Sequence, residues 1–189
     1  EEIADPNRTP NPAKAPWYFL GLQELLVYFD PWIAGVLLPT VMLVGLAAIP
    51  YVDSNPKGVG SYAGMRERKF ACTVFIVGAA MWFLLIVIGT FFRGPNWAWY
   101  WPWESWEMHK PLPSSTVDLP PYLGGSLILA YFGGGMLVIR RWFKNLSPLR
   151  YLTMASMLLM MIGVLVKIVL RLGFNVKYIF SWPQMSFNI

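Results

Sequence analysis

Glu24 is a carboxylate whose surroundings suit proton transfer. It lies in the segment from Trp17 onwards, where apolar residues recur at helical spacing. These residues are Phe19, Leu22, Leu25 and Leu26. The pattern predicts a short amphipathic helix at a membrane surface, on which Trp17 and Glu24, seven positions apart, lie near one face. A partly desolvated carboxylate there can act as a base, whereas the alternative interpretation makes Glu24 a solvated residue of the polar face, like Gln23.

The residue types that bind metals and haem are scarce in the sequence. It contains one cysteine, Cys72, and one histidine, His109. A single cysteine permits no internal disulfide and no CxxC or CxxCH site. A single histidine cannot supply both ligands of a bis-histidine haem, so we expect this chain alone to bind neither haem nor metal. We interpret His109 as a surface residue and Cys72 as a small packing residue.

The composition is that of a membrane protein. Of 189 residues, 56% are hydrophobic and only 13% are charged, against about 25% charged in an ordinary soluble domain. The net charge of +5 rests on few charges, so it does not indicate binding to nucleic acid. The same numbers exclude a disordered tail and a disulfide-stapled secreted module.

Four apolar stretches are long enough to cross a bilayer, which takes about 20 helical residues. They span about residues 32–52, 70–92, 122–139 and 149–172. They are longer than barrel strands and do not alternate in polarity, so helices are expected. The predicted fold class is therefore an all-α integral membrane protein with four transmembrane helices. We expect residues 1–30 to form a loop and a surface helix, and residues 31–189 to form the membrane domain.

Basic residues predict the orientation. The loop after the first span and the loop after the third span each contain four basic residues, which places both loops on the cytoplasmic side. These residues are Lys57, Arg66, Arg68, Lys69, Arg140, Arg141, Lys144 and Arg150. The first 30 residues and the loop after the second span then face the positive side. The C-terminal segment disagrees, because it should lie there too and yet is basic. Within it, Lys167 and Arg171 share a helix face and are expected to snorkel to the interface or to bind an anionic lipid headgroup.

The loop after the second span is rich in tryptophan. Trp97, Trp99, Trp101 and Trp103 alternate, so they could share one face of an extended segment. We interpret them as an interfacial aromatic belt, and the alternative is a docking surface for a peripheral subunit. In the third span, glycines at 124, 125, 133, 134 and 135 predict close helix packing.

Residues 3–92 resemble a known family. The run ADPNRTPNPAKAPWYF is similar to the Qo-site loop in the C-terminal half of cytochrome b, and particularly to subunit IV of cytochrome b6f complexes. The matching positions are Ala4, Asp5, Pro6, Thr9, Pro10, Trp17, Tyr18 and Phe19. The resemblance continues through the first two spans. The fourth span has no counterpart in the family's eight-helix core. The helix that precedes the loop in the family is not in this sequence, and it is expected either in a preceding part of the protein or on a partner chain.

The resemblance implies a subunit of a quinol:cytochrome c oxidoreductase, with quinol oxidised at this loop and protons released on the positive side. It implies b-type haems on a cytochrome b6-like partner chain, a Rieske iron–sulfur protein and a c-type cytochrome. It also implies lipid contacts, a dimeric complex, a bacterial inner membrane and a periplasmic N-terminal loop. Menaquinol is a plausible substrate. No cofactor is expected to be bound covalently by this chain.

The sequence departs from the family at one motif. The family has Pro-Glu-Trp-Tyr where this chain has Ala15-Pro16-Trp17-Tyr18, so Pro16 replaces a glutamate that takes a quinol proton in the family. We hypothesise that Glu24 takes over this role and that Tyr18 hydrogen-bonds the quinol. The expected quinol-binding residues are Pro16, Trp17, Tyr18 and Glu24. The alternatives are an interfacial role for Tyr18 and a packing role for Trp17.

Two other functions stay open. The chain could be a non-catalytic anchor that docks a multihaem cytochrome through its tryptophan loop, which the missing motif glutamate favours. It could also be part of a transporter, but its spans contain no mid-membrane charge apart from the end of the fourth.

Overall fold

The structure is a computed structural model that describes residues 12–52, 64–107, 110, 117–182 and 187–188. Four helices are long and apolar enough to cross a membrane, which confirms the predicted all-α membrane fold. The first span consists of a π-helical turn, Ile33–Leu37, that continues into α2, Leu38–Val52. The others are α3 (Lys69–Phe91), α4 (Pro121–Trp142) and α5 (Pro148–Phe174). Helix α4 therefore ends three residues beyond the expected boundary.

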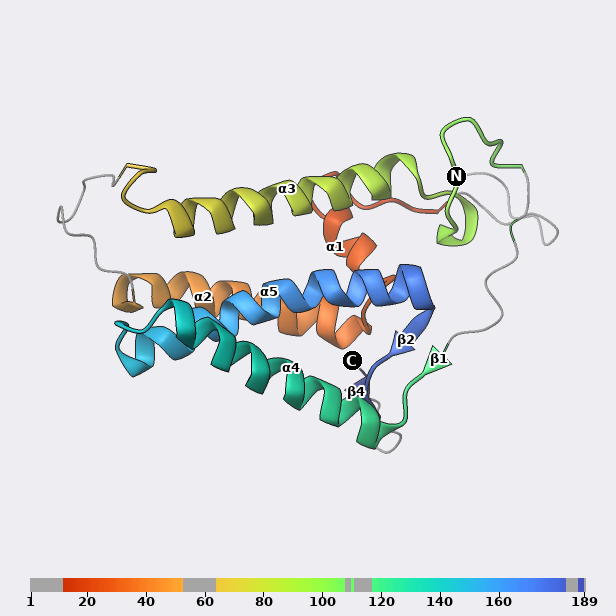
Figure 1. Cartoon of the computed structure of the whole chain (residues 1–189). Coiled ribbons are helices and arrows are strands. Elements are labelled where there is room, and N and C mark those ends of the chain that lie inside the picture. The colour runs from red at the N-terminus through yellow and green to blue at the C-terminus, as the bar shows by residue number, and fades with distance from the viewer. Residues whose placement is uncertain (1–11, 53–63, 108–109, 111–116, 183–186, 189) are drawn as a thin grey trace.

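The spans form two groups. Helix α5 packs against α2 and α4, while α3 runs along the other side of the short helix α1, Leu20–Leu25 (Figure 1). Glycines allow the first group to approach closely: Met157 of α5 lies against Gly45, and Leu159 of α5 lies against Gly135. The packing expected of the α4 glycines thus holds at Gly135. Gly133 and Gly134 pack on no described residue of this chain, because a Cβ added to either would meet no described atom within 4 Å.

Helix α1 is shorter and more enclosed than the sequence predicts. It begins at Leu20 instead of near Trp17 and crosses α3. Gly21 receives the ring of Trp82, and Gly89 receives the side chain of Leu20, so the absence of a Cβ on each helix permits the crossing. The adjoining core cluster contains Leu25, Tyr28, Ala34 and Leu85, with Val164 and Ile168 of α5 packed against it. Helix α1 therefore connects α3 to the other spans instead of resting on lipid alone.

Short strands join the chain segments at the end of the bundle where α1 lies. Strand β1, Val117–Asp118, pairs in parallel with β2, Val176–Tyr178. Strand β3, Ser181–Trp182, pairs antiparallel with β4, Phe187–Asn188. Asn175, in the left-handed conformation with φ of 54°, ends α5 and directs the chain into β2. This end therefore gathers α1, the loop after α3, the start of α4 and the segment after α5 (Figure 1).

Candidate functional site

The extended arm before α1 is held by two polar side chains. The side-chain amide of Gln23 accepts a hydrogen bond from the Ala15 backbone N–H at 2.9 Å and donates one to the Ala13 carbonyl at 3.1 Å. The ammonium of Lys14 donates to the Thr90 carbonyl in the last turns of α3 at 2.6 Å. Partial burial lowers the pKa of Lys14. These contacts fix the arm to α1 and to the end of α3.

The arm leads into an exposed aromatic turn. Pro16 begins it, and its carbonyl accepts a hydrogen bond from the Phe19 N–H at 2.8 Å. The side chains of Trp17, Tyr18 and Phe19 are 65%, 51% and 53% exposed. The rings contact one another in sequence, with centroids 5.7 Å apart for Trp17 and Tyr18 and 4.7 Å apart for Tyr18 and Phe19. Three of the predicted site residues, Pro16, Trp17 and Tyr18, thus form one surface that is open to a ligand or to another chain.

Glu24, the fourth predicted residue, is completely buried. Arg93 binds its carboxylate with two groups, Nη2 at 2.5 Å from Oε1 and Nε at 2.9 Å from Oε2. The Tyr28 hydroxyl donates to Oε1 at 2.8 Å, and the Trp97 indole N–H donates to Oε2 at 3.1 Å. We call these four residues the carboxylate cage. Because Glu24 is enclosed in the cage, it is not a solvated residue of the polar face. Its carboxylate is also fully hydrogen-bonded, so it is not a free base in this arrangement.

Arg93 is also buried, with 5% of its surface exposed. Besides Glu24, it donates from Nη1 to the Trp97 carbonyl at 3.1 Å, and its guanidinium lies 5.5 Å from the ring centre of Trp99. A buried ion pair is stable only when further hydrogen bonds satisfy both charges, and the cage supplies them. Burial and the adjacent Glu24 charge raise the pKa of Tyr28, so its hydroxyl stays protonated and can donate.

A tight turn after α3 brings Trp97 back to Glu24. A 3₁₀ turn, Pro95–Trp97, follows the helix, and Asn96 and Trp97 both adopt positive φ values, 58° and 55°. The buried Tyr100 ring closes the turn from one side, since a Cβ on Gly94 would lie only 2.6 Å from it. The expectation that Trp97 shares a face with the following tryptophans is therefore wrong, because the turn rotates its indole into the cage.

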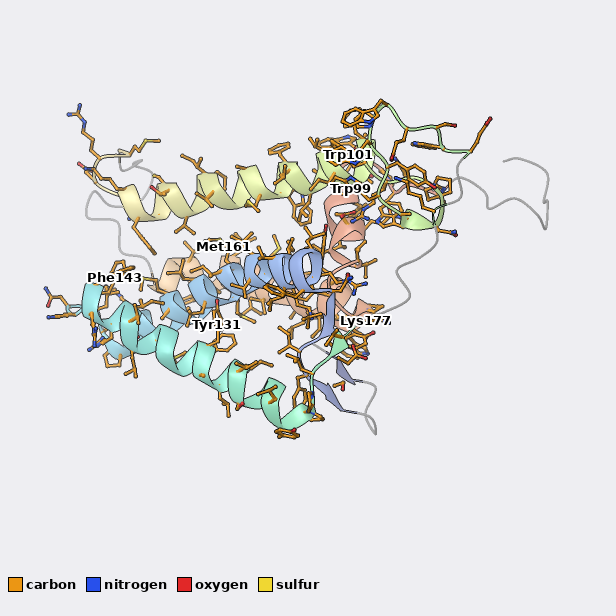
Figure 2. All side chains as sticks on the ribbon, turned by 45° about the vertical axis from the view of Figure 1, so that its right-hand side comes forward. Trp99, Trp101, Tyr131, Phe143, Met161 and Lys177 are labelled. Atoms are coloured by element: carbon orange, nitrogen blue, oxygen red, sulfur yellow. The ribbon has the colours of Figure 1, made fainter. Side chains whose placement is uncertain are left out.

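The remaining alternate tryptophans do form a row. Trp99 stacks on Phe92 with centroids 5.0 Å apart, Trp101 follows at 5.7 Å from Trp99, and Trp103 stacks on Trp101 at 5.3 Å. Trp99 and Trp101 lie at the end of α3, close to α1 (Figure 2). Exposure increases outwards, from the partly buried Trp99 to Trp103 at 78%. The row thus begins beside Arg93 and ends in an exposed indole.

The structure also tests the predictions for residues outside the cage and the aromatic turn. Lys167 does not snorkel within the described part of the chain: it is 2% exposed, and its ammonium donates to the Lys177 carbonyl at 2.8 Å. The turn into β2 brings the Lys177 carbonyl back to α5, where it accepts the hydrogen bond from the Lys167 ammonium. Asp5 and His109 lie outside the described residues. Among the described residues, no group of three or more His, Cys, Asp or Glu side chains could hold a metal ion.

The sequence interpretation missed Arg93, Tyr28 and Trp97 as partners of Glu24. Two features of the sequence point to these partners. Glu24 and Tyr28 stand four positions apart, so they are neighbours on a helical face. Arg93 is the first charge after a long uncharged span, which places it at the membrane boundary near the predicted surface helix.

A comparison with protein families gives a match. The model of the family described as "Cytochrome b(C-terminal)/b6/petD" matches residues 3–105, a little more than half of the chain. The matched part includes the arm, α1, α2, α3, the whole carboxylate cage and the whole tryptophan row, whereas α4 and α5 lie outside it. No solved structure matches the chain. The match extends the resemblance noted above to Arg93 and Trp97, and the chain thus belongs to the cytochrome b C-terminal/b6/petD family, whose members are membrane subunits of bc-type electron-transfer complexes.

Proposed function

We propose that this subunit forms part of the quinol-oxidation site of a bc-type quinol:cytochrome c oxidoreductase, together with the proton exit from that site. The observation that carries the proposal is the position of Glu24 next to Gln23 on α1. Gln23 binds the arm that leads to Tyr18, while Glu24 provides a buried carboxylate on the same helix turn. The aromatic turn and a carboxylate are thus fixed to one short element.

In this proposal the quinol ring lies against the aromatic turn. Pro16 and Trp17 shape the surface, and the Tyr18 hydroxyl hydrogen-bonds a quinol oxygen. Glu24 accepts a quinol proton after it gives up one of its present hydrogen bonds. The neutral donors Tyr28 and Trp97 cost about 1–3 kcal/mol to release, less than the charged Arg93. Arg93 would thus keep the carboxylate in place while a neutral donor exchanges.

The electron acceptors belong to partner chains in this proposal. The chain has one histidine, so it lacks the ligand pair that a bis-histidine haem needs. We therefore assign the b haems to a cytochrome b6-like partner, the iron–sulfur cluster to a Rieske protein, and the next acceptor to a c-type cytochrome. The complex would be dimeric, with menaquinol as a candidate substrate. The basic loops favour an orientation with the arm on the periplasmic side of a bacterial inner membrane.

The test is quinol:cytochrome c reductase turnover of the purified complex with Glu24→Gln. We expect turnover to fall at least tenfold, about 1.4 kcal/mol in the barrier, with haem content unchanged. Glu104→Gln is a matched control, because Glu104 is a carboxylate of the same end that is ion-paired with Lys110 outside the cage. Unchanged turnover in Glu24→Gln would contradict the role of Glu24.

A double variant separates proton transfer from the cost of an unpaired buried arginine. In Glu24→Gln with Arg93→Gln both charges are gone, so no buried charge lacks a partner. If Glu24 accepts the proton, the double variant stays as slow as the single one. Recovery of turnover in the double variant would assign the loss to the unpaired Arg93 and would exclude Glu24 as the proton acceptor.

The exposed tryptophan row favours a second function, a non-catalytic anchor for a multihaem cytochrome. Trp101 and Trp103 stack with an interplanar angle of 7° and are 44% and 78% exposed. Such a flat aromatic surface suits a protein partner. If the purified wild-type complex contains no b haem and has no quinol turnover, the anchor replaces the quinol-oxidising subunit as the better proposal.

A further inference from the structure

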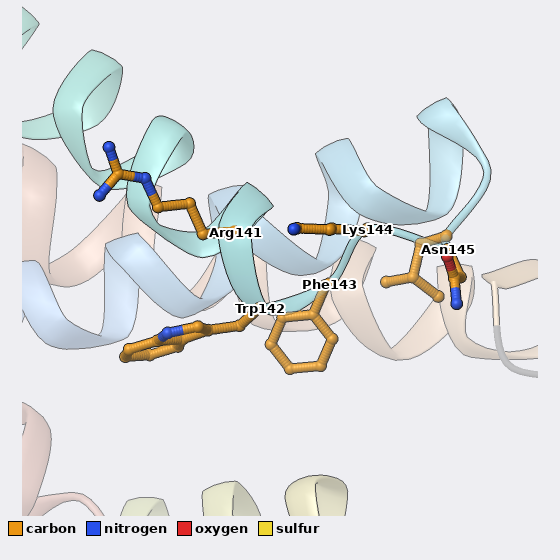
Figure 3. Close-up of a pocket in the computed structure, with 6 residues that line it drawn as sticks. Arg141, Trp142, Phe143, Lys144 and Asn145 are labelled. Atoms are coloured by element: carbon orange, nitrogen blue, oxygen red, sulfur yellow. The ribbon is translucent and has the colours of Figure 1, made fainter.

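A basic hollow lies at the opposite end of the molecule from the carboxylate cage. It has a volume of about 490 Å³ and is lined by Arg141, Trp142, Phe143, Lys144, Asn145 and Leu146 (Figure 3). These residues follow one another where α4 ends at Trp142 and before α5 begins at Pro148. The hollow therefore lies where two membrane spans leave the bilayer, and it is outside the part of the chain that the family match covers.

The surroundings of the hollow are strongly cationic. Residues 140–150 contain four basic residues and no acidic one. The start of α3 lies beside this segment, because the rings of Phe70 and Phe143 are in contact with centroids 5.0 Å apart. Residues 64–69 add three basic residues and one acidic residue, Glu67. An anion at this end of the molecule is therefore attracted by both loops.

Two of these cations line the hollow itself. Arg141 and Lys144 are exposed, and neither forms a salt bridge with another described residue. Arg140 differs, because its guanidinium lies 4.8 Å from the ring centre of Tyr151. Arginine and lysine are the side chains that bind phosphate, and the Asn145 amide adds a neutral donor. The hollow thus offers a phosphate two charges and one amide.

The apolar part of the hollow distinguishes a lipid from a soluble anion. Trp142 and Phe143 lie side by side below the two cations, and Trp142 is 77% exposed (Figure 3). Tryptophan at the end of a membrane span lies at headgroup depth, with its ring against the glycerol and upper acyl region. A soluble phosphate would leave this aromatic surface uncovered, whereas a phospholipid covers it.

We propose that the hollow binds the phosphate of an anionic phospholipid, with Arg141 and Lys144 holding the headgroup and Trp142 contacting the lipid backbone. Basic pockets between membrane helices on the cytoplasmic side bind such headgroups. The site does not depend on the proposed quinol chemistry, because it lies at the other end of the spans. In this proposal, the connection between α4 and α5 retains lipid on the complex.

The experiment measures phospholipid retained by the purified complex. The complex is equilibrated in nanodiscs of phosphatidylcholine and phosphatidylglycerol, extracted into detergent, and analysed for bound lipid by mass spectrometry. We expect the wild-type complex to retain phosphatidylglycerol and the variant Arg141→Gln with Lys144→Gln to retain at least tenfold less. The charge-conserving pair Arg141→Lys with Lys144→Arg should retain most of it.

Matched controls make the result specific. Lys110→Gln with Lys177→Gln removes two positive charges at the other end of the molecule and should leave retention unchanged. Equal retention by wild type and the Arg141/Lys144 variant would overturn the proposal. So would displacement of the lipid by inorganic phosphate alone, which would indicate a soluble-anion site. Loss of a protein subunit from the variant with lipid retention intact would instead assign the surface to a protein partner.

Discussion

Glu24 and Arg93 illustrate how far a single residue can be understood from the sequence. The apolar neighbours of Glu24 indicate partial desolvation, and the residue is in fact fully buried. Its ion-pair partner lies 69 positions away, so no local pattern reveals it. The partner becomes available only because α1 crosses α3, with Gly21 close to the Trp82 ring and Gly89 close to Leu20. The carboxylate was therefore predictable as a candidate, and Tyr28 as its neighbour on the helix, but the direct pairing of Glu24 with Arg93 was not.

Substitution of Arg93 tests the energetic role of the cage. Arg93→Gln leaves the Glu24 carboxylate buried without its counter-charge, which costs about 3–5 kcal/mol when one partner of a buried pair is removed. We expect a clear decrease in the thermal unfolding temperature of the purified complex. Arg93→Lys keeps the charge but not the two-pronged geometry, so its decrease should be smaller. A complex as stable as wild type with Arg93→Gln would show that the pair does not stabilise the fold.

At the scale of elements, the spans and the site differ in predictability. The four membrane helices follow from long apolar runs, which act locally and leave little freedom in lipid. The arm and α1 depend on contacts between distant segments. Gln23 faces the arm whereas Glu24, the next residue, faces the loop after α3. A periodicity argument treats both as members of one polar face and cannot separate their partners.

Gln23→Ala tests whether α1 positions the aromatic turn. The change removes the hydrogen bonds to Ala13 and Ala15, so the arm loses its attachment to α1. We expect faster trypsin cleavage after Lys14 and a KM for quinol raised several-fold with a smaller change in kcat. Gln23→Glu serves as the control, because it keeps an acceptor for the Ala15 N–H and loses only the donor. Identical cleavage rates in Gln23→Ala and wild type would show that the attachment is unimportant.

At the scale of the whole molecule, the helices outside the matched region support the site. Val164 and Ile168 of α5 pack on the core cluster that contains Leu25 and Tyr28. The segment after α5 is in turn fixed to the loop before α4 by the pairing of β1 and β2. The family match ends at residue 105, so the fourth span was predictable as a membrane helix but its packing on the core cluster that contains Leu25 was not.

Lys167→Met tests how the C-terminal segment is held. The change removes the buried ammonium that donates to the Lys177 carbonyl, and a hydrogen bond from a charged group contributes about 1.5–3 kcal/mol. We expect faster hydrogen exchange of the backbone amides of residues 176–178. Arg171→Met is the control, because Arg171 donates a long hydrogen bond, 3.5 Å, to the Asn175 carbonyl and none to the Lys177 carbonyl among the described residues. Equal exchange in wild type and Lys167→Met would indicate that strand pairing alone fixes the segment.

The burial of the Glu24–Arg93 pair has a consequence for the dependence of the complex on ionic strength. Dissolved ions screen charges that water reaches, and they screen buried pairs far less. The approach of a charged soluble electron carrier, in contrast, slows steeply as salt is added. If the proposed function holds, salt should therefore raise the concentration of carrier needed for half-maximal turnover and change the quinol dependence of turnover little.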